Sequence, residues 1–179
     1  AGNRDEMRDR PWLAPARHWP DRPEIRAGLD ELADGTWFGV ADHGVVASVT
    51  NRPGTLGPDA QRRSRGELVL EALEHTTAQE AAEALSHLNP AAYRGFNLIV
   101  GDPKQVFWIC HPSDEDDRIL VQEIPPGLHM IDAGDLDDMS SPRIKRCLPR
   151  FQALQRPDVA AAENPWREWQ QLLADTDPQ

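Results

Sequence analysis

Two pairs of short segments are rich in apolar and β-branched residues, a composition typical of β-strands. The first pair is residues 36–41 and 45–51, and the second is residues 96–101 and 105–110. Each pair is joined by a three-residue connection, which suits a β-hairpin. The sequence therefore predicts two hairpins. We expect one in each of two sheets or adjoining layers, with shorter strands at 119–124 and 128–131.

Helix signals follow each hairpin. An apolar run predicts a helix that opens near Ser64, and Thr77 with Glu80 forms a capping-box pair ahead of a second helix. A Ser-Pro pair at 141–142 and an Asn-Pro pair at 164–165 mark two further helix starts.

Antiparallel hairpins segregated from helices predict an α+β layered fold, not a doubly wound one. A length of 179 residues suits one domain, which we place over residues 1–179. The chain contains no phosphate-binding loop, dinucleotide fingerprint or zinc-binding helix motif. These absences argue against the common nucleotide and zinc chemistries, so we predict no cofactor and no metal.

The charge balance restricts the class of partner. The chain has 19 basic and 30 acidic residues, a net charge of −11, which disfavours nucleic acid and anionic membranes. No apolar run approaches the roughly 20 residues that span a bilayer, so we predict no transmembrane segment. Cys110 and Cys147 are too few for a disulfide framework, which favours a reducing, cytoplasmic location. Only Lys104 and Lys145 are lysines, an arginine bias that indicates a bacterial source.

Eight short blocks occur in the order typical of one protein family. They are residues 3–6 (Asn-Arg-Asp-Glu), 10–11, 27–30, 35–40, 49–51, 63–69, 95–102, and 136–138 ahead of 141–143. On these blocks, which span about residues 1 to 150, the chain resembles the NRDE family, the relatives of transport and Golgi organisation protein 2.

The resemblance implies a fold like that of the N-terminal nucleophile (Ntn) hydrolases, an αββα sandwich with antiparallel sheets. In that group an N-terminal cysteine attacks an amide carbonyl and its own amino group is the base. Asp5 resembles the carboxylate of the turn that holds the nucleophile, and Asn51 resembles a donor to the oxyanion. The resemblance thus makes Asp5 and Asn51 the candidate catalytic residues.

The chain also departs from the family pattern. It begins at Ala1 without the cysteine, and it ends at Gln179 before the strands expected after the last helix. We therefore expect segments to be missing at both ends, and the chain as it stands not to carry out nucleophilic catalysis.

Further polar residues are candidates for ligand binding. Paired arginines can hold an anionic ligand by forked hydrogen bonds, although arginines near a helix start are more often ion-paired. The acidic run at 114–117 is typical of a solvated loop. Cys110 and His111 are strand neighbours that point to opposite faces, which argues against a thiol–imidazole pair. The candidate ligand-binding residues are Asn3, Arg4, Glu6, Arg63, Arg65 and Asn97.

Two functions that involve a ligand remain open, beside a third in which the chain is a plain interaction domain without one. The first is hydrolysis of amide or thioester bonds in small acylated substrates, through a cysteine upstream of this chain. The alternative is a non-catalytic binding or trafficking protein for haem or an acyl-lipid in the equivalent cleft. Lone histidines such as His18 and His129 can ligate haem iron but are more often structural. Both functions predict a small or amphiphilic ligand.

Overall fold

The structure is a computed structural model that describes residues 2, 9–57, 59–160 and 164–175. The chain divides into two compact units. The sheet unit is residues 6–125, and the helical unit is residues 1–5 together with 126–179.

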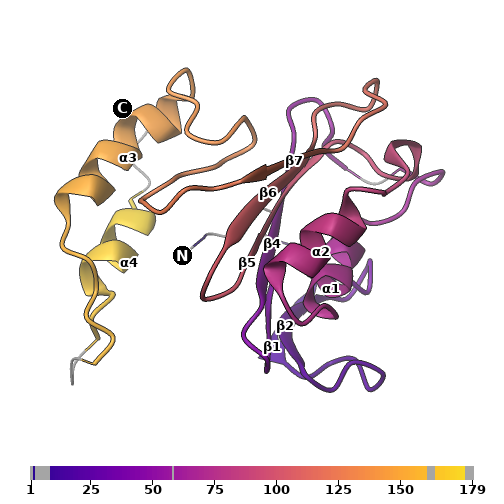
Figure 1. Cartoon of the computed structure of the whole chain (residues 1–179), viewed down its shortest axis with the longest axis horizontal. Coiled ribbons are helices and arrows are strands. Elements are labelled where there is room, and N and C mark those ends of the chain that lie inside the picture. The colour runs from indigo at the N-terminus through magenta and orange to yellow at the C-terminus, as the bar shows by residue number, and fades with distance from the viewer. Residues whose placement is uncertain (1, 3–8, 58, 161–163, 176–179) are drawn as a thin grey trace. The chain divides into compact units, whose positions relative to one another are not determined.

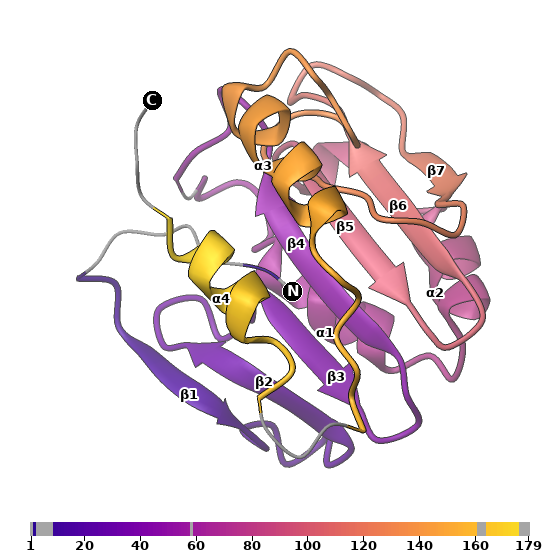
Figure 2. The same cartoon turned by 90° about the vertical axis from the view of Figure 1, so that its left-hand side faces the viewer.

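The sheet unit contains a seven-stranded antiparallel sheet whose strands are neighbours in chain order. Figure 2 shows this succession from β1 to β7. The strands are β1 (Trp12–Ala16), β2 (Ile25–Asp30), β3 (Phe38–Ala41), β4 (Val46–Asn51), β5 (Phe96–Gly101), β6 (Val106–His111) and β7 (Leu120–Glu123). An α+β fold with antiparallel strands is thereby confirmed.

Both predicted hairpins are present, as β3–β4 and β5–β6, but they lie in the same sheet. Strand β4 pairs with β5 along its whole length, from Val46 opposite Gly101 to Asn51 opposite Phe96. The expectation of separate layers was wrong. The long connection between the hairpins folds back over one face of the sheet, so that β5 returns beside β4.

Strands β1 and β2 were not predicted. The β1 segment carries Pro15, which lacks a backbone N–H and is tolerated in sheets mainly at edge strands. Among the described strands β1 is an edge of the sheet, so no described strand pairs with its outer side, where a proline is tolerated.

Two helices, α1 (Gly66–Leu73) and α2 (Ala78–Leu85), cover one face of the sheet, as Figure 1 shows. Together with a short 3-10 turn, η1 (Pro90–Ala92), they form the connection from β4 to β5. The core between helices and sheet is fully buried; its larger members include Ile25, Leu68, Leu73, Leu85, Phe96, Leu98 and Ile109. The opposite side of the sheet is called the far face below.

The Asp102 carboxylate joins the start of α2 to the β5–β6 hairpin. The Thr77 hydroxyl accepts from Glu80 N at 3.2 Å, as the capping box predicts. Asp102, in the β5–β6 turn, accepts from Ala78 N at 2.8 Å and from Lys104 N at 2.7 Å. Asp102 thus orders the turn and fixes the start of α2 on the sheet.

The helical unit contains α3 (Pro142–Ala153) and α4 (Arg167–Leu173). The Ser141 hydroxyl caps α3 by accepting from Ile144 N, as predicted. Phe151 and Trp169 pack together with ring centroids 5.0 Å apart. In the described part of the chain, no helix is long and apolar enough to cross a membrane.

The predicted strand at 128–131 is absent, and that prediction was wrong. Met130 N donates to the Asp137 carboxylate at 2.8 Å, and Met130 O accepts from Asp137 N at 2.8 Å. Because both backbone groups are used inside a loop, they are not available to a β-ladder.

Candidate functional site

Four of the candidate site residues, Asn3, Arg4, Asp5 and Glu6, lie outside the described residues. The convergence of Asp5 with Asn51 therefore stays a prediction. The other four, Asn51, Arg63, Arg65 and Asn97, all lie in the sheet unit.

Asn51 and Asn97 occupy neighbouring strands but different faces. Asn51 pairs with Phe96, whose ring is completely buried in the core under α1 and α2. Asn97 pairs with Thr50, on the far face. Paired residues share a face and successive residues alternate, so the sheet backbone separates the two asparagine side chains.

Asn97 is the centre of a polar cluster on the far face. Its side chain is 1% exposed, and its Oδ1 accepts from Arg52 Nη1 and Trp108 Nε1, both at 3.1 Å. Its Nδ2 lies 3.5 Å from Thr50 Oγ1. We call Thr50, Arg52, Asn97 and Trp108 the far-face cluster. A buried amide with several partners is held in a fixed orientation.

Arg52 also joins the cluster to the residue that follows β6. Its Nε donates to Pro112 O at 3.1 Å, just beyond β6. The sequence interpretation missed Arg52 and Trp108. Strand alternation is the signal that could have found Arg52, because it lies two positions after Thr50 and therefore on the same face.

Arg65 donates to peptide carbonyls. Its Nη1 reaches Thr55 O at 3.0 Å and Gly95 O at 2.9 Å, which fastens the loop after β4 to the start of β5. The Thr55 hydroxyl accepts from the same Nη1 at 2.9 Å. Arg65 therefore orders the loop that follows β4.

Arg63 lies at the exposed start of α1 and does not reach the same groups. It pairs with Glu67 at 2.7 Å, and its guanidinium lies 5.2 Å from the centroid of the Tyr93 ring. Burial raises the pKa of Tyr93 to about 12, so this phenol stays protonated at neutral pH. Arg63 is therefore ion-paired near the start of a helix, which is the alternative that the sequence left open.

Asp114 holds two more arginines at this end of the sheet. Its carboxylate accepts from Gly95 N at 2.8 Å and from Arg94 Nε at 3.0 Å, and it lies 3.2 Å from Arg62 Nη1. Burial alone raises the pKa of Asp114, but the Gly95 N–H and the two guanidinium groups outweigh it and hold the pKa below its usual value. The interpretation of 114–117 as merely a solvated loop was wrong for Asp114.

The Cys110 and His111 side chains point to opposite faces, as strand geometry predicts. Cys110 pairs with Asn97 on the far face and is 1% exposed. His111 packs against Phe96 on the helix side, and its Nε2 lies 3.0 Å from Asp116 O. The register thus excludes a thiol–imidazole pair between these two residues. Elsewhere in the described chain, no three His, Cys, Asp or Glu residues form a group able to hold a metal ion.

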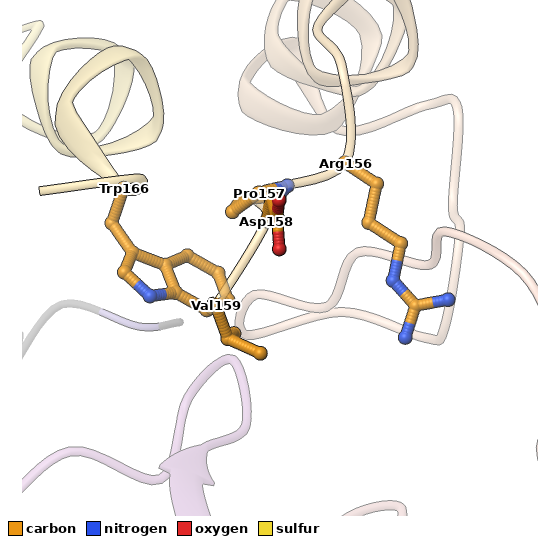
Figure 3. Close-up of a pocket in the computed structure, with 5 residues that line it drawn as sticks. All are labelled: Arg156, Pro157, Asp158, Val159 and Trp166. Atoms are coloured by element: carbon orange, nitrogen blue, oxygen red, sulfur yellow. The ribbon is translucent and has the colours of Figure 1, made fainter. Parts of the chain in front are cut away.

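One open pocket of about 420 Å³ lies in the helical unit, in the connection between α3 and α4. Figure 3 shows its lining, with the Arg156 guanidinium directed away from the Trp166 ring. Pro157, Asp158 and Val159 complete it. None of the candidate site residues belongs to it.

A comparison with protein-family models supports the resemblance found in the sequence. The model described as Transport and Golgi organisation 2 matches residues 1–178. The chain belongs to this family. The far-face cluster takes Thr50 and Asn97 from two of the sequence blocks that carry the family resemblance.

Curated members of the Transport and Golgi organisation 2 family match part of the chain. The human transport and Golgi organization protein 2 homolog is 39% identical over 109 residues, which is 57% of this chain and 37% of the human protein. The bovine homolog is 38% identical over 109 residues, and the mouse homolog is 38% identical over 112 residues. The matched stretch is 37% of each relative's length. Membership in the family assigns no catalytic or ligand-binding role to any residue.

Proposed function

We propose that this member of the Transport and Golgi organisation 2 family binds small acylated compounds, with the acyl carbonyl or a carboxylate of the ligand at the far-face cluster. The observation that carries the proposal is the convergence of guanidinium, indole and hydroxyl groups on the buried Asn97 amide.

The chemistry of these groups suits an oxygen-rich ligand. The single indole N–H of Trp108 is already donated to Asn97, so the group that suits the ligand is the Arg52 guanidinium, which donates hydrogen bonds in a fork that matches a carboxylate. Asn97 holds Arg52 and Trp108 in place, so little ordering is needed when a ligand binds.

The neighbouring part of the far face is apolar. Phe38 is 45% exposed and Val40 is 36% exposed, and their partners Ser48 and Val46 lie on the same face of β4 as Thr50. A ligand with an apolar chain and an acidic or carbonyl head can contact both regions, because successive same-face residues are about 7 Å apart along a strand.

We also propose that the sheet unit is one half of an Ntn-hydrolase-like αββα sandwich, with the far face turned inward. Two features of the described sheet unit support this: its own helices, α1 and α2, cover one face of the sheet, and the other face carries exposed apolar side chains. A soluble domain buries such a surface against another layer. A cytoplasmic location and a bacterial source stay predictions.

Hydrolysis of the bound acyl compound is a second candidate function. Membership in the family supports it. The side chain of Asn51, the last residue of β4, lies on the face opposite the far-face cluster, so the reacting carbonyl would have to extend past the end of the strand to reach it. In this reaction a cysteine preceding Ala1 attacks an amide or thioester carbonyl and the amine or thiol leaves. Water then hydrolyses the acyl-enzyme, with Asp5 near the nucleophile and Asn51 donating to the oxyanion.

Binding of N-octanoylglycine, followed by isothermal titration calorimetry, tests the proposal. This probe combines an apolar chain, an amide carbonyl and a carboxylate. We expect saturable binding that Arg52→Gln weakens at least about tenfold, the loss typical of a charge-assisted hydrogen bond. Arg63→Gln removes the same charge from the exposed start of α1 and is the matched control, with an affinity within about twofold of the wild type.

Equal weakening of probe binding by both substitutions, or no binding of the probe, would contradict the proposed site.

Haem in place of the probe tests the trafficking alternative, since its propionates are carboxylates on an apolar ring. Glycine release from the probe by a form of the protein with a cysteine placed ahead of Ala1 tests hydrolysis. Binding without release in that form would leave the binding proposal standing and remove the hydrolytic one.

A further inference from the structure

The pocket in the connection between α3 and α4 contains a guanidinium and a carboxylate that do not pair with each other. Arg156 and Asp158 both line this pocket. In Figure 3 the Asp158 carboxylate lies between the Arg156 and Trp166 side chains. Within the described residues, the Arg156 side chain has no hydrogen bond and no ion pair. Opposite charges that share a pocket without pairing can each bind one end of a ligand that carries both charges.

The Asp158 carboxylate is oriented by its own turn. Its Oδ1 accepts from Ala160 N at 3.0 Å, the hydrogen bond of an Asx turn. In the described part of the chain, its Oδ2 accepts no hydrogen bond. A carboxylate that is held by one oxygen can accept from a ligand with the other, and little ordering is then needed on binding.

The apolar wall of the pocket is positioned by aromatic packing. The Trp166 ring meets the Trp169 ring edge-on, with centroids 5.8 Å apart and an interplanar angle of 87°. Trp169 in turn packs against Phe151, which is 7% exposed. Trp166 is itself 37% exposed, so part of its ring remains open to a ligand. Pro157 and Val159 complete the apolar lining, so the pocket has an apolar side and a charged side.

We propose that this pocket binds an apolar α-amino acid as its zwitterion. The ligand carboxylate pairs with the forked donors of Arg156, its ammonium donates to Asp158 Oδ2, and its side chain packs against Trp166. The volume of about 420 Å³ lies in the range of small-molecule sites, roughly 300–1,000 Å³. A zwitterion has no net charge, so the net charge of −11 does not repel it. The proposal uses no residue of the far-face cluster and is independent of the proposed function.

The first test compares three ligands on the wild-type chain by NMR titration, followed through the indole ¹H–¹⁵N signal of Trp166. L-Phenylalanine should shift this signal saturably. N-Acetyl-L-phenylalanine lacks the ammonium and L-phenylalaninamide lacks the carboxylate. Each should therefore bind at least about threefold more weakly, the contribution of one exposed ion pair. Equal affinities for the three ligands, or no saturable shift with L-phenylalanine, overturn the proposal.

The second test assigns each charge of the ligand to one side chain. Arg156→Gln and Asp158→Asn should each weaken L-phenylalanine binding at least about threefold. Arg156→Gln should no longer distinguish L-phenylalanine from its amide, and Asp158→Asn should no longer distinguish it from the N-acetyl compound, because each variant has lost the group that reads the difference. Arg63→Gln and Asp117→Asn remove the same charges from the exposed surface of the sheet unit and are the matched controls. Pocket variants that bind L-phenylalanine as tightly as these controls overturn the proposal, and so do pocket variants that still distinguish the ligands as the wild type does.

Discussion

Asn51 and Asn97 lie one residue apart in register on adjacent strands, yet the sheet backbone separates their side chains. Asn97 faces Thr50 and is hydrogen-bonded to Arg52 and Trp108. Within the described chain the Asn51 side chain forms no hydrogen bond. The two asparagines cannot act on one ligand atom from the same side of the sheet, and their contributions to stability should differ accordingly.

Replacing each asparagine by leucine tests this difference. Asn97→Leu removes the acceptor of two donors in a buried site, and an unsatisfied buried donor costs about 1–3 kcal/mol. We expect a loss in the free energy of unfolding of that size. Asn51→Leu should cost less than about 1 kcal/mol. Urea denaturation of both variants measures the two values, and equal losses would show that the Asn97 network does not order the sheet.

Gly66 and Gly35 lie so close together that a glycine-to-alanine substitution at Gly66 should lower stability, the opposite of its usual effect in a helix. Gly66 is the first residue of α1, and inside helices glycine-to-alanine changes usually stabilise by about 0.5–1 kcal/mol. A Cβ at Gly66 would lie 2.9 Å from Thr36 N and 3.2 Å from Gly35 Cα, both backbone atoms. We therefore expect Gly66→Ala to destabilise the protein by about 1–3 kcal/mol. Gln79→Ala, on exposed α2 surface, should change the melting temperature little, and a stabilised Gly66→Ala would refute the close packing of α1.

Asp102 predicts a pH dependence of stability. The Ala78 N–H is the largest of the contacts that lower the pKa of Asp102, and the Lys104 N–H adds to it. A carboxyl with a lowered pKa in the folded state stabilises the fold above its unfolded pKa of about 3.9. That stabilisation is lost as the pH falls through the lower, folded value.

The free-energy difference between wild type and Asp102→Asn should therefore be about 1–2 kcal/mol at pH 6 and shrink below pH 4. Denaturant melts from pH 3 to pH 6 measure it. Asp117→Asn, in an exposed loop, serves as the control. A difference that stays constant across this range would mean that the Asp102 charge does not hold α2 to the hairpin.

Local signals in the sequence were sufficient for the elements that local chemistry determines. Thr77 and Ser141 cap helices as expected, because a cap depends on residues three positions away. The order of strands is not local. The pairing of Val46 with Gly101 joins positions separated by both helices, and only the packed core determines it.

The same distinction applies to the candidate site. The family resemblance pointed to Asn97, but its partner Arg52 lies 45 positions away and was found only in the structure. Asp114 looked like part of a solvated acidic run, and its partners Arg94 and Arg62 are 20 and 52 positions away. Contacts over such separations leave no periodic pattern, so a single sequence does not reveal them.

An NMR titration tests most directly whether acyl ligands bind at the far-face cluster. The indole Nε1–H of Trp108 donates to Asn97, so its ¹H–¹⁵N signal reports on the centre of the cluster. On titration with N-octanoylglycine, the signals of the Trp108 indole and the Asn97 side-chain amide should shift and saturate together. The indole of Trp19, buried with the helix-side core, should not shift. Unchanged Trp108 and Asn97 signals at saturating probe, or shifts confined to other residues, would contradict the proposed site.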